Sequence, residues 1–144
     1  MRAIHVPEKM MEAYDYENNP ATFSRGIKVR VRDLDKWVFI SGTASIGTDG
    51  KTQHIGNFVK QTKLMFDNVT QVLSQANVTW HDVVKTTIYI KNIAKHYKDF
   101  NRVRKDFYDT LQLKPYPAST CVQAALCRKD LLIEMEAIAF KHGL

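Results

Sequence analysis

Two glutamates, Glu134 and Glu136, interrupt the apolar stretch from Leu131 to Phe140 near the end of the chain. A spacing of two residues sends both carboxylates to one face of an extended strand, whose other face is wholly apolar. Apolar neighbours favour the protonated form of a carboxyl group, which brings its pKa toward the range where it can orient water and transfer protons. The pattern therefore suggests acid–base chemistry, although on its own it fits better a strand with one face in solvent.

The other reactive side chains form no familiar catalytic or metal-binding pattern. Cys121 and Cys127 lie six residues apart on one predicted strand and its exit, on the order of 20 Å, which is too far for a disulfide. The histidines are scattered, without the i, i+4 or Cys-x-x-Cys spacing of metal sites. Cys121 has no neighbouring His or Lys to activate it as a nucleophile, so it is most simply a packed thiol. We expect neither a metal nor a cofactor.

Length and composition predict one ordinary domain over residues 1–144, because 144 residues with 44% hydrophobic content can bury a real core. The start is too polar for a signal peptide, and no stretch approaches the roughly 18 apolar residues of a membrane span. We therefore expect a soluble, cytoplasmic protein. The net charge is +6, and the basic residues cluster in two places. In "RGIKVRVRDLDK" they alternate with apolar residues, as on the solvent face of a strand, and in "RVRKDF" they lie on a predicted helix, where we interpret them as a solvated face. This disfavours a nucleic-acid partner and favours an anionic small molecule.

The elements that must position these residues follow from hydrophobic periodicity, which predicts the order strand, strand, helix, strand, helix, strand, strand. The predicted bounds are a hairpin of Ile27–Arg32 and Trp37–Ser41, a helix capped by Asn57, a central strand Val83–Lys91, a helix His96–Leu111, and strands Ala118–Leu126 and Leu131–Phe140.

Both predicted helices are amphipathic, so both should cover one face of the sheet and leave the other face without cover from this chain. A tight turn in "CRKD" would pair the last two strands as a hairpin, with Cys121 opposite Glu136 and Gln123 opposite Glu134. We therefore predict that Ser119, Cys121 and both glutamates share one side of the sheet. A face that mixes apolar and acidic groups suits a subunit contact containing a cleft.

Several motifs resemble one known family. They are "FISG" at Phe39–Gly42, "DVVKTTIYIKNI" at Asp82–Ile93, "YKDFNRV" at Tyr97–Val103 and "YPASTCVQAALCRKDLLIEMEAIAF" at Tyr116–Phe140. In this order and at these separations they resemble the RidA/YjgF family, also labelled endoribonuclease L-PSP, and the match runs from about Phe23 to Phe140. The resemblance implies an α+β, chorismate-mutase-like fold with two helices on one face of a mixed sheet. It also implies a homotrimer with a central barrel and three clefts between subunits.

The family's best-known activity is hydrolysis of reactive 2-imino and enamino acids to 2-oxo acids and ammonia. In the active members of the family, an arginine in a Pro-Ala-Arg-Ser segment binds the substrate carboxylate. Here the segment reads "PAST", and Ser119 stands at the arginine position. Charge-assisted hydrogen bonds contribute about 1.5 to 3 kcal/mol each, so the change predicts an altered substrate preference or a loss of activity.

The remaining site residues are assigned by the resemblance. Glu134 matches the glutamate that positions the attacking water, while Glu136 has no assigned role. The expected substrate-binding residues are Phe23, Arg25, Ser41, Gly42, Asn101, Ser119, Thr120 and Cys121. Phe23 replaces a tyrosine of the pocket wall. We hypothesise that Arg25 supplies the cation lost at Ser119; equally, Arg25 fits the start of a basic, solvent-facing strand.

Three functions remain open at this point. The first is a deaminase-type hydrolase that acts on an imine, an enamine or a related small carboxylate in a cleft between subunits. The second is a non-catalytic protein that binds such a metabolite for sensing or sequestration. The third is an endoribonuclease of the translation-inhibitor type, which we rank last because one cleft glutamate provides no acid–base pair for strand cleavage.

Overall fold

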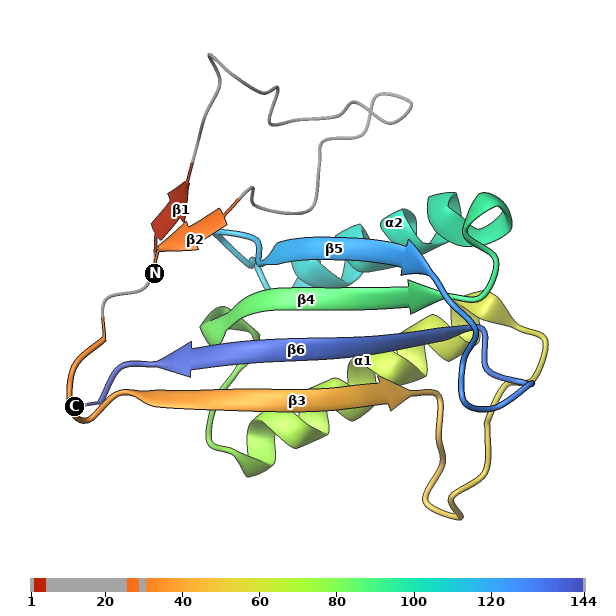
Figure 1. The fold of residues 1–144 in the computed structure, drawn as a ribbon, viewed down its shortest axis with the longest axis horizontal. Helices are drawn as coiled ribbons and strands as arrows, with labels where there is room; N and C mark the ends of the chain where they lie inside the picture. Colours follow the sequence, from red (N-terminus) through yellow and green to blue (C-terminus); the bar gives the residue numbers. More distant parts are fainter. Residues whose placement is uncertain (1, 5–25, 29–30, 144) are drawn as a thin grey trace.

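The computed structural model describes residues 2–4, 26–28 and 31–143. Its elements in chain order are β1 (Arg2–Ile4), β2 (Gly26–Lys28), β3 (Lys36–Ala44), α1 (Phe58–Gln75), the 3-10 turn η1 (Trp80–Asp82), β4 (Val83–Ile90), α2 (Ile93–Thr110), β5 (Ala118–Gln123) and β6 (Ile133–Lys141). Four strands form a mixed sheet in the order β3-β6-β4-β5, and both α-helices lie behind it on one face (Figure 1). The predicted α+β class, with two helices on one face of a mixed sheet, is confirmed.

Asparagine side chains begin both α-helices. Oδ1 of Asn57 accepts the backbone N–H of Lys60 at 3.0 Å, and Oδ1 of Asn92 accepts that of Lys95 at the same distance. These bonds satisfy backbone donors that a helix otherwise leaves unpaired in its first turn. The start of α1 is as predicted, whereas α2 begins at Ile93, one turn before the predicted His96.

β4 is an inner strand of the sheet, as predicted, together with β6. It pairs with β5 in parallel and with β6 in antiparallel register. Thr86, Ile88 and Ile90 are fully buried, while the residues between them are only half-buried. This alternation places one side of β4 under the helices and the other side on the face that carries no helix in the described part of the chain.

The predicted hairpin of the last two strands is wrong. β5 pairs with β4, and β6 runs on the other side of β4, next to β3. β5 ends at Gln123 and β6 begins at Ile133, so the charged "CRKD" segment lies in a connection that crosses the end of β4 rather than in a tight turn. An alternating pattern of apolar and polar residues identifies a strand, but it does not show which other strand it pairs with.

The predicted hairpin of Ile27–Arg32 with Trp37–Ser41 is also absent from the described residues. The short strand Gly26–Lys28 pairs with β1, and β3 pairs with β6. Residues 31 and 32 are not part of a strand. The second predicted strand is real and extends over Lys36–Ala44.

The observed pairing places Ser119 and Glu134 on opposite faces of the sheet, whereas the sequence predicted one shared face. Ser119 pairs with Thr86, so it shares the buried, helix-covered side of β4, and Cys121 follows two residues later on the same side. Glu134 pairs instead with Tyr89, on the side without helices. Directly opposed residues share a face. The prediction that Ser119, Cys121 and the two glutamates lie on one face is therefore wrong.

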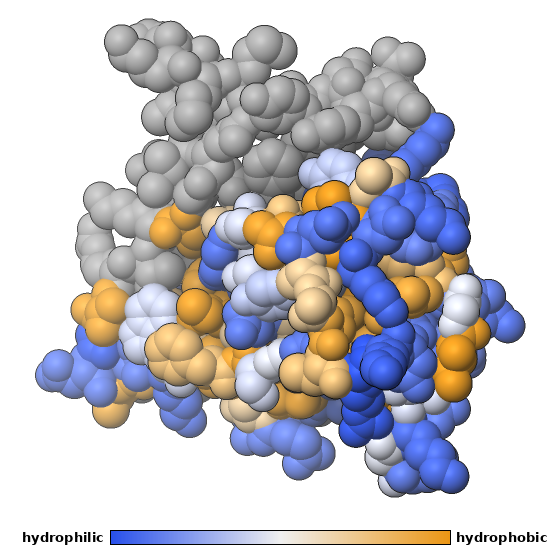
Figure 2. Space-filling view, turned by 45° about the vertical axis from the view of Figure 1, so that its right-hand side comes forward, coloured by the Kyte–Doolittle hydropathy of each residue, from blue (hydrophilic) through white to orange (hydrophobic). Residues whose placement is uncertain are grey.

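The face without helices presents large apolar side chains among polar ones. The Phe39 side chain is 74% exposed and that of Trp37 is 44% exposed, and the Trp37 ring packs edge-on against Phe140 with centroids 4.8 Å apart. Figure 2, turned toward one edge of the molecule, shows hydrophobic groups interspersed with hydrophilic ones. Within the described ranges, neither helix is long and apolar enough to cross a membrane.

Candidate functional site

The Glu134 carboxylate occupies a space that a glycine leaves open. The pairing of β3 with β6 shifts register between Ile40 and Thr43, and Ser41 and Gly42 form this irregular stretch. A Cβ atom built on Gly42 would lie 1.8 Å from Oε1 of Glu134. The irregularity and the missing side chain thus bring the backbone of the "SG" pair directly against the carboxylate.

The two glutamates differ in their surroundings. Glu136 is exposed, and its Oε2 accepts a hydrogen bond from the hydroxyl of Tyr89 at 3.0 Å. This hydrogen bond is the main reason why the pKa of Tyr89 is raised. Glu134 is half-buried, and its side chain has no hydrogen bond or ion pair within the described residues. Glu134 is therefore the carboxylate that remains available to a water molecule or ligand.

A second group of polar side chains gathers around Arg104, under the helix-covered face. Arg104 lies on α2 and is only 3% exposed. Its Nη2 donates to Oδ1 of Asn101 at 2.7 Å, and its Nη1 donates to Oγ of Ser119 at 3.1 Å. The guanidinium carbon also lies 4.8 Å from the ring centre of Phe100, in cation–π geometry. Asn101 and Ser119 were both predicted as binding residues, and the structure joins them through Arg104.

Arg104 was missed because its run "RVRK" was interpreted as a solvated helix face. The spacing between Arg104 and Phe100 could have identified Arg104 as a buried residue. Residues 100, 103 and 104 lie on one side of a helix, so the apolar stripe of Phe100 and Val103 includes Arg104.

Burial dominates the electrostatics of this second group. Desolvation lowers the pKa of the Arg104 guanidinium. Burial also raises the pKa of the Cys121 thiol to about 11, although the nearby charge of Arg104 acts in the opposite direction. A thiol with this pKa is protonated at neutral pH, and the thiolate is the nucleophilic form. Cys121 is thus suited to line a site rather than to attack a substrate.

The other predicted binding residues lie elsewhere. Thr120 is exposed on the helix-free face, where its hydroxyl oxygen accepts a hydrogen bond from Nζ of Lys85. Phe23 and Arg25 fall outside the described residues. The hypothesis that Arg25 replaces the missing arginine accordingly stays a prediction.

The sheet separates the two groups within one chain. Ser41, Gly42 and Glu134 meet at the paired ends of β3 and β6, whereas Asn101, Arg104 and Ser119 meet between α2 and β5. β4 lies between β6 and β5, and the two groups project from opposite faces. A small ligand therefore cannot contact both groups of the same chain.

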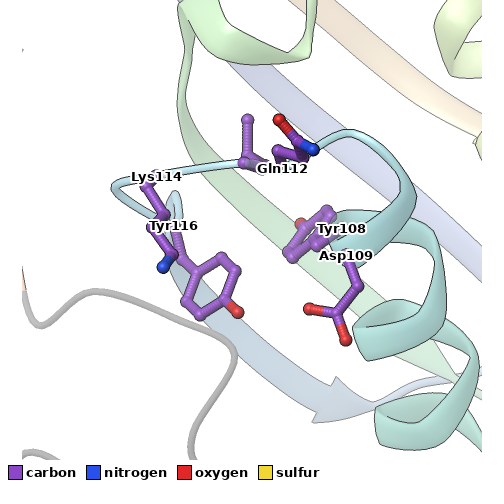
Figure 3. Close-up of a pocket in the computed structure, with 6 residues that line it drawn as sticks. Tyr108, Asp109, Gln112, Lys114 and Tyr116 are labelled. Atoms are coloured by element: carbon purple, nitrogen blue, oxygen red, sulfur yellow. The ribbon is translucent and has the colours of Figure 1, made fainter.

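A hollow of about 490 Å³ opens at the end of α2, but it contains none of the predicted site residues. Tyr108 and Asp109 lie on its helix side, with Lys114 and Tyr116 opposite (Figure 3). The rings of Tyr108 and Tyr116 stack with centroids 5.7 Å apart. Burial raises the pKa of Tyr108 to about 12, so its phenol is neutral at physiological pH. We therefore place the candidate site at the two polar groups described above.

Comparisons with known proteins point to one family. The family model described as Endoribonuclease L-PSP matches residues 17–141. A RutC family protein of Pyrococcus abyssi is 34% identical over 122 residues, which cover 83% of this chain and 87% of that protein. The 2-iminobutanoate/2-iminopropanoate deaminase of Salmonella typhimurium is 33% identical over 129 residues, covering 88% and 94%. The crystal structure of E. coli TdcF with bound serine superposes with a TM-score of 0.67 at 26% identity, covering 99% of this chain and 100% of TdcF.

Proposed function

Because the chain belongs to the RidA/YjgF family, whose model is described as Endoribonuclease L-PSP, we propose that it hydrolyses the imine of a small 2-amino acid to a 2-oxo acid and ammonium. A relative 33% identical to this chain is named as a 2-iminobutanoate/2-iminopropanoate deaminase, and the TdcF crystal structure contains bound serine, a small amino acid. The observation that carries the proposal is the Glu134 carboxylate, half-buried, against Gly42 and without a partner in the described residues.

The proposed reaction needs one group that moves protons. Glu134 accepts a proton from water as the water oxygen bonds to C2 of the iminium, giving a tetrahedral carbinolamine. The protonated glutamic acid then passes a proton to the amine. The C–N bond then breaks and ammonia leaves, while Glu134 accepts the proton of the carbinolamine hydroxyl as the 2-oxo acid forms. That proton passes to ammonia, so the products are the 2-oxo acid and ammonium and Glu134 is again a carboxylate. No redox step or covalent enzyme intermediate is involved.

We propose that the reaction takes place in a cleft between subunits of a homotrimer. Within one chain the sheet separates the Glu134 group from the Arg104 group. The support is that, between two neighbouring copies, the Glu134 group of one copy can lie next to the Arg104 group of the other. The helix-free face, with Phe39 74% exposed, supplies an apolar surface for such an assembly. Three copies around an axis would make three equivalent clefts.

The second candidate function is binding of a small carboxylate without catalysis. It is favoured by Ser119, which stands where the active members of the family carry an arginine, and by a buried guanidinium that attracts an anion whether or not chemistry follows. The same assay separates the two candidates, because a binder gives no acceleration over the spontaneous hydrolysis of the imine.

The test is release of 2-oxobutanoate from freshly generated 2-iminobutanoate, measured for the native protein, Glu134→Gln and Glu136→Gln. We expect Glu134→Gln to lower the rate about 10² to 10⁴-fold, the usual contribution of general acid–base catalysis. Glu136→Gln is the matched control: it removes the same charge two residues away and should change the rate little. Equal rates for the native protein and Glu134→Gln would remove Glu134 from the mechanism.

A further inference from the structure

A buried cation without an anion is the most unusual electrostatic feature of the described chain. The guanidinium of Arg104 is 3% exposed, yet both of its hydrogen-bond acceptors, Ser119 and Asn101, are neutral. No Asp or Glu pairs with Arg104 in the described ranges. Burial of a charge is unfavourable unless the charge is paired, so this site lacks the group that would balance it.

The hydrogen bonds of Arg104 leave donors unused. A guanidinium carries five N–H groups, and the bonds to Asn101 and Ser119 occupy two of them in the described structure. Nε is buried and has no hydrogen-bond partner among the residues that the structure describes. Unpaired N–H groups in a planar fork match the geometry of a carboxylate, which accepts two parallel hydrogen bonds.

We propose that Arg104 binds the carboxylate of the substrate and so takes over the task of the arginine that Ser119 replaces. The identity of that carboxylate as part of a 2-oxo or 2-imino acid rests on the proposed function. The serine hydroxyl orients Nη1 through the bond of 3.1 Å. A guanidinium on α2 thus binds the substrate carboxylate in place of a guanidinium on β5.

The surroundings of Arg104 allow an anion to approach. Asn101 and Ser119 are both half-exposed, so the hydrogen-bonded rim reaches the surface even though the guanidinium lies beneath it. The neighbouring Cys121 thiol is protonated at neutral pH, because burial raises its pKa to about 11, and it does not repel a carboxylate. Three acidic residues lie on α2: Asp106 and Asp109 are exposed, Asp99 is paired with Arg102, and Asp109 is paired with Lys105.

The test measures binding of 2-oxobutanoate by isothermal titration and by thermal shift, independently of turnover. Arg104→Met, which keeps an unbranched apolar stem but removes the guanidinium and its charge, should bind about tenfold to hundredfold more weakly than the native protein. Arg104→Lys should lie between them, since it retains the charge without the fork. Arg102→Gln, which removes a cation from the exposed side of the same helix, should bind like the native protein, and Arg25→Gln is measured beside it as the variant of the rival cation. The neutral amide 2-oxobutanamide should bind the native protein and Arg104→Met equally weakly.

A double variant that moves the guanidinium from α2 to β5 distinguishes loss of the binding group from loss of the fold. Ser119→Arg combined with Arg104→Met returns a guanidinium to the site from β5, and it should recover binding that Arg104→Met alone loses. Because an unpaired buried cation is unfavourable, Arg104→Met without ligand should melt at the same temperature as the native protein or higher. Unfolding of Arg104→Met, together with a double variant that folds without binding, would overturn the proposal.

Three further results would also contradict it. They are unchanged 2-oxobutanoate binding by Arg104→Met, loss of binding in Arg25→Gln alone, and stabilisation by inorganic phosphate but not by 2-oxobutanoate. The outcome is distinct from that of the hydrolysis assay. A protein that binds 2-oxobutanoate through Arg104 without accelerating imine hydrolysis would refute the proposed reaction and support this inference, and the reverse result would refute this inference alone.

Discussion

Gly42 and Glu134 fit together only because one of them has no side chain. A Cβ atom on Gly42 would lie 1.8 Å from Oε1 of Glu134 and 2.9 Å from its carboxyl carbon. Both atoms belong to the far end of a flexible side chain, so an added methyl group displaces the carboxylate rather than the backbone. The pair therefore links a local irregularity of β3 to the position of the proposed proton-transfer group.

Gly42→Ala should reduce imine hydrolysis strongly, at least tenfold, with little change in stability, because the displaced carboxylate turns toward solvent. The matched control is Gly56→Ala. Gly56 has a φ of +76°, and no described residue would lie within 4 Å of a Cβ there, so alanine costs backbone strain of about 1 kcal/mol but leaves the site intact. Hydrolysis rates and melting curves of both variants check the prediction. An active Gly42→Ala would show that the exact place of the carboxylate is unimportant.

Phe39→Asp should prevent self-association. The Phe39 side chain is 74% exposed on the helix-free face, so an aspartate costs little within one subunit but introduces an unpaired charge into an apolar contact. Light scattering after size-exclusion chromatography should show trimers for the native protein and monomers for Phe39→Asp. Val72→Asp, at a 41% exposed position on α1, should remain trimeric. A native protein that is monomeric at micromolar concentration would contradict the proposed assembly.

Cys121 should react with iodoacetamide far more slowly than Cys127 at pH 8. Cys127 is exposed, whereas burial raises the pKa of Cys121 to about 11. Only the thiolate reacts, so the rate for Cys121, isolated in a Cys127→Ser background, should increase with pH and level off only near pH 11. Arg104 lowers this pKa, so Arg104→Met should shift the rise to still higher pH. A plateau below pH 9 would contradict the assignment.

The raised pKa of Cys121 also makes the stability of the folded protein depend on pH. Between the unfolded thiol pKa of about 9 and the folded value of about 11, the folded state holds the proton more tightly. Its contribution to stability is thus fully present below pH 9 and decreases as the pH increases through this window. Chemical denaturation of native protein and Cys121→Ala at pH 8 and pH 10.5 should show a smaller loss at high pH for the variant. An equal loss would mean that Cys121 does not titrate in this range.

The sequence predicted the features that depend on local pattern. Asn57 was recognised as a helix cap, because the residues after it repeat at three and four positions, and β4 was recognised as central from its β-branched run. The pairing of β5 was not recoverable in this way, because register and neighbours are set by contacts between distant segments. That single error placed Ser119 and Glu134 on the same face.

Arg104 was missed for a related reason. A basic residue in a charged run is usually solvated, and only the helical spacing from Phe100 indicated that its side chain turns inward. Gly42, and the choice of Glu134 over Glu136, came from the family resemblance, which transfers positions without requiring knowledge of the strand order. The resemblance pointed to Ser119 as a lost contact, but only the folded chain shows which guanidinium lies beside it.

The central claim is that Glu134 of one copy and Arg104 of its neighbour act on the same substrate. Co-expression of Glu134→Gln with Arg104→Met chains, each differently tagged so that trimers containing both can be purified, tests this directly. Each variant alone should be nearly inactive, whereas every mixed cyclic trimer has one cleft, about a third of the total, in which both residues are intact. We predict imine hydrolysis near one third of the native rate in the mixed trimers. Mixed trimers no more active than the two parent variants would contradict a site shared between subunits.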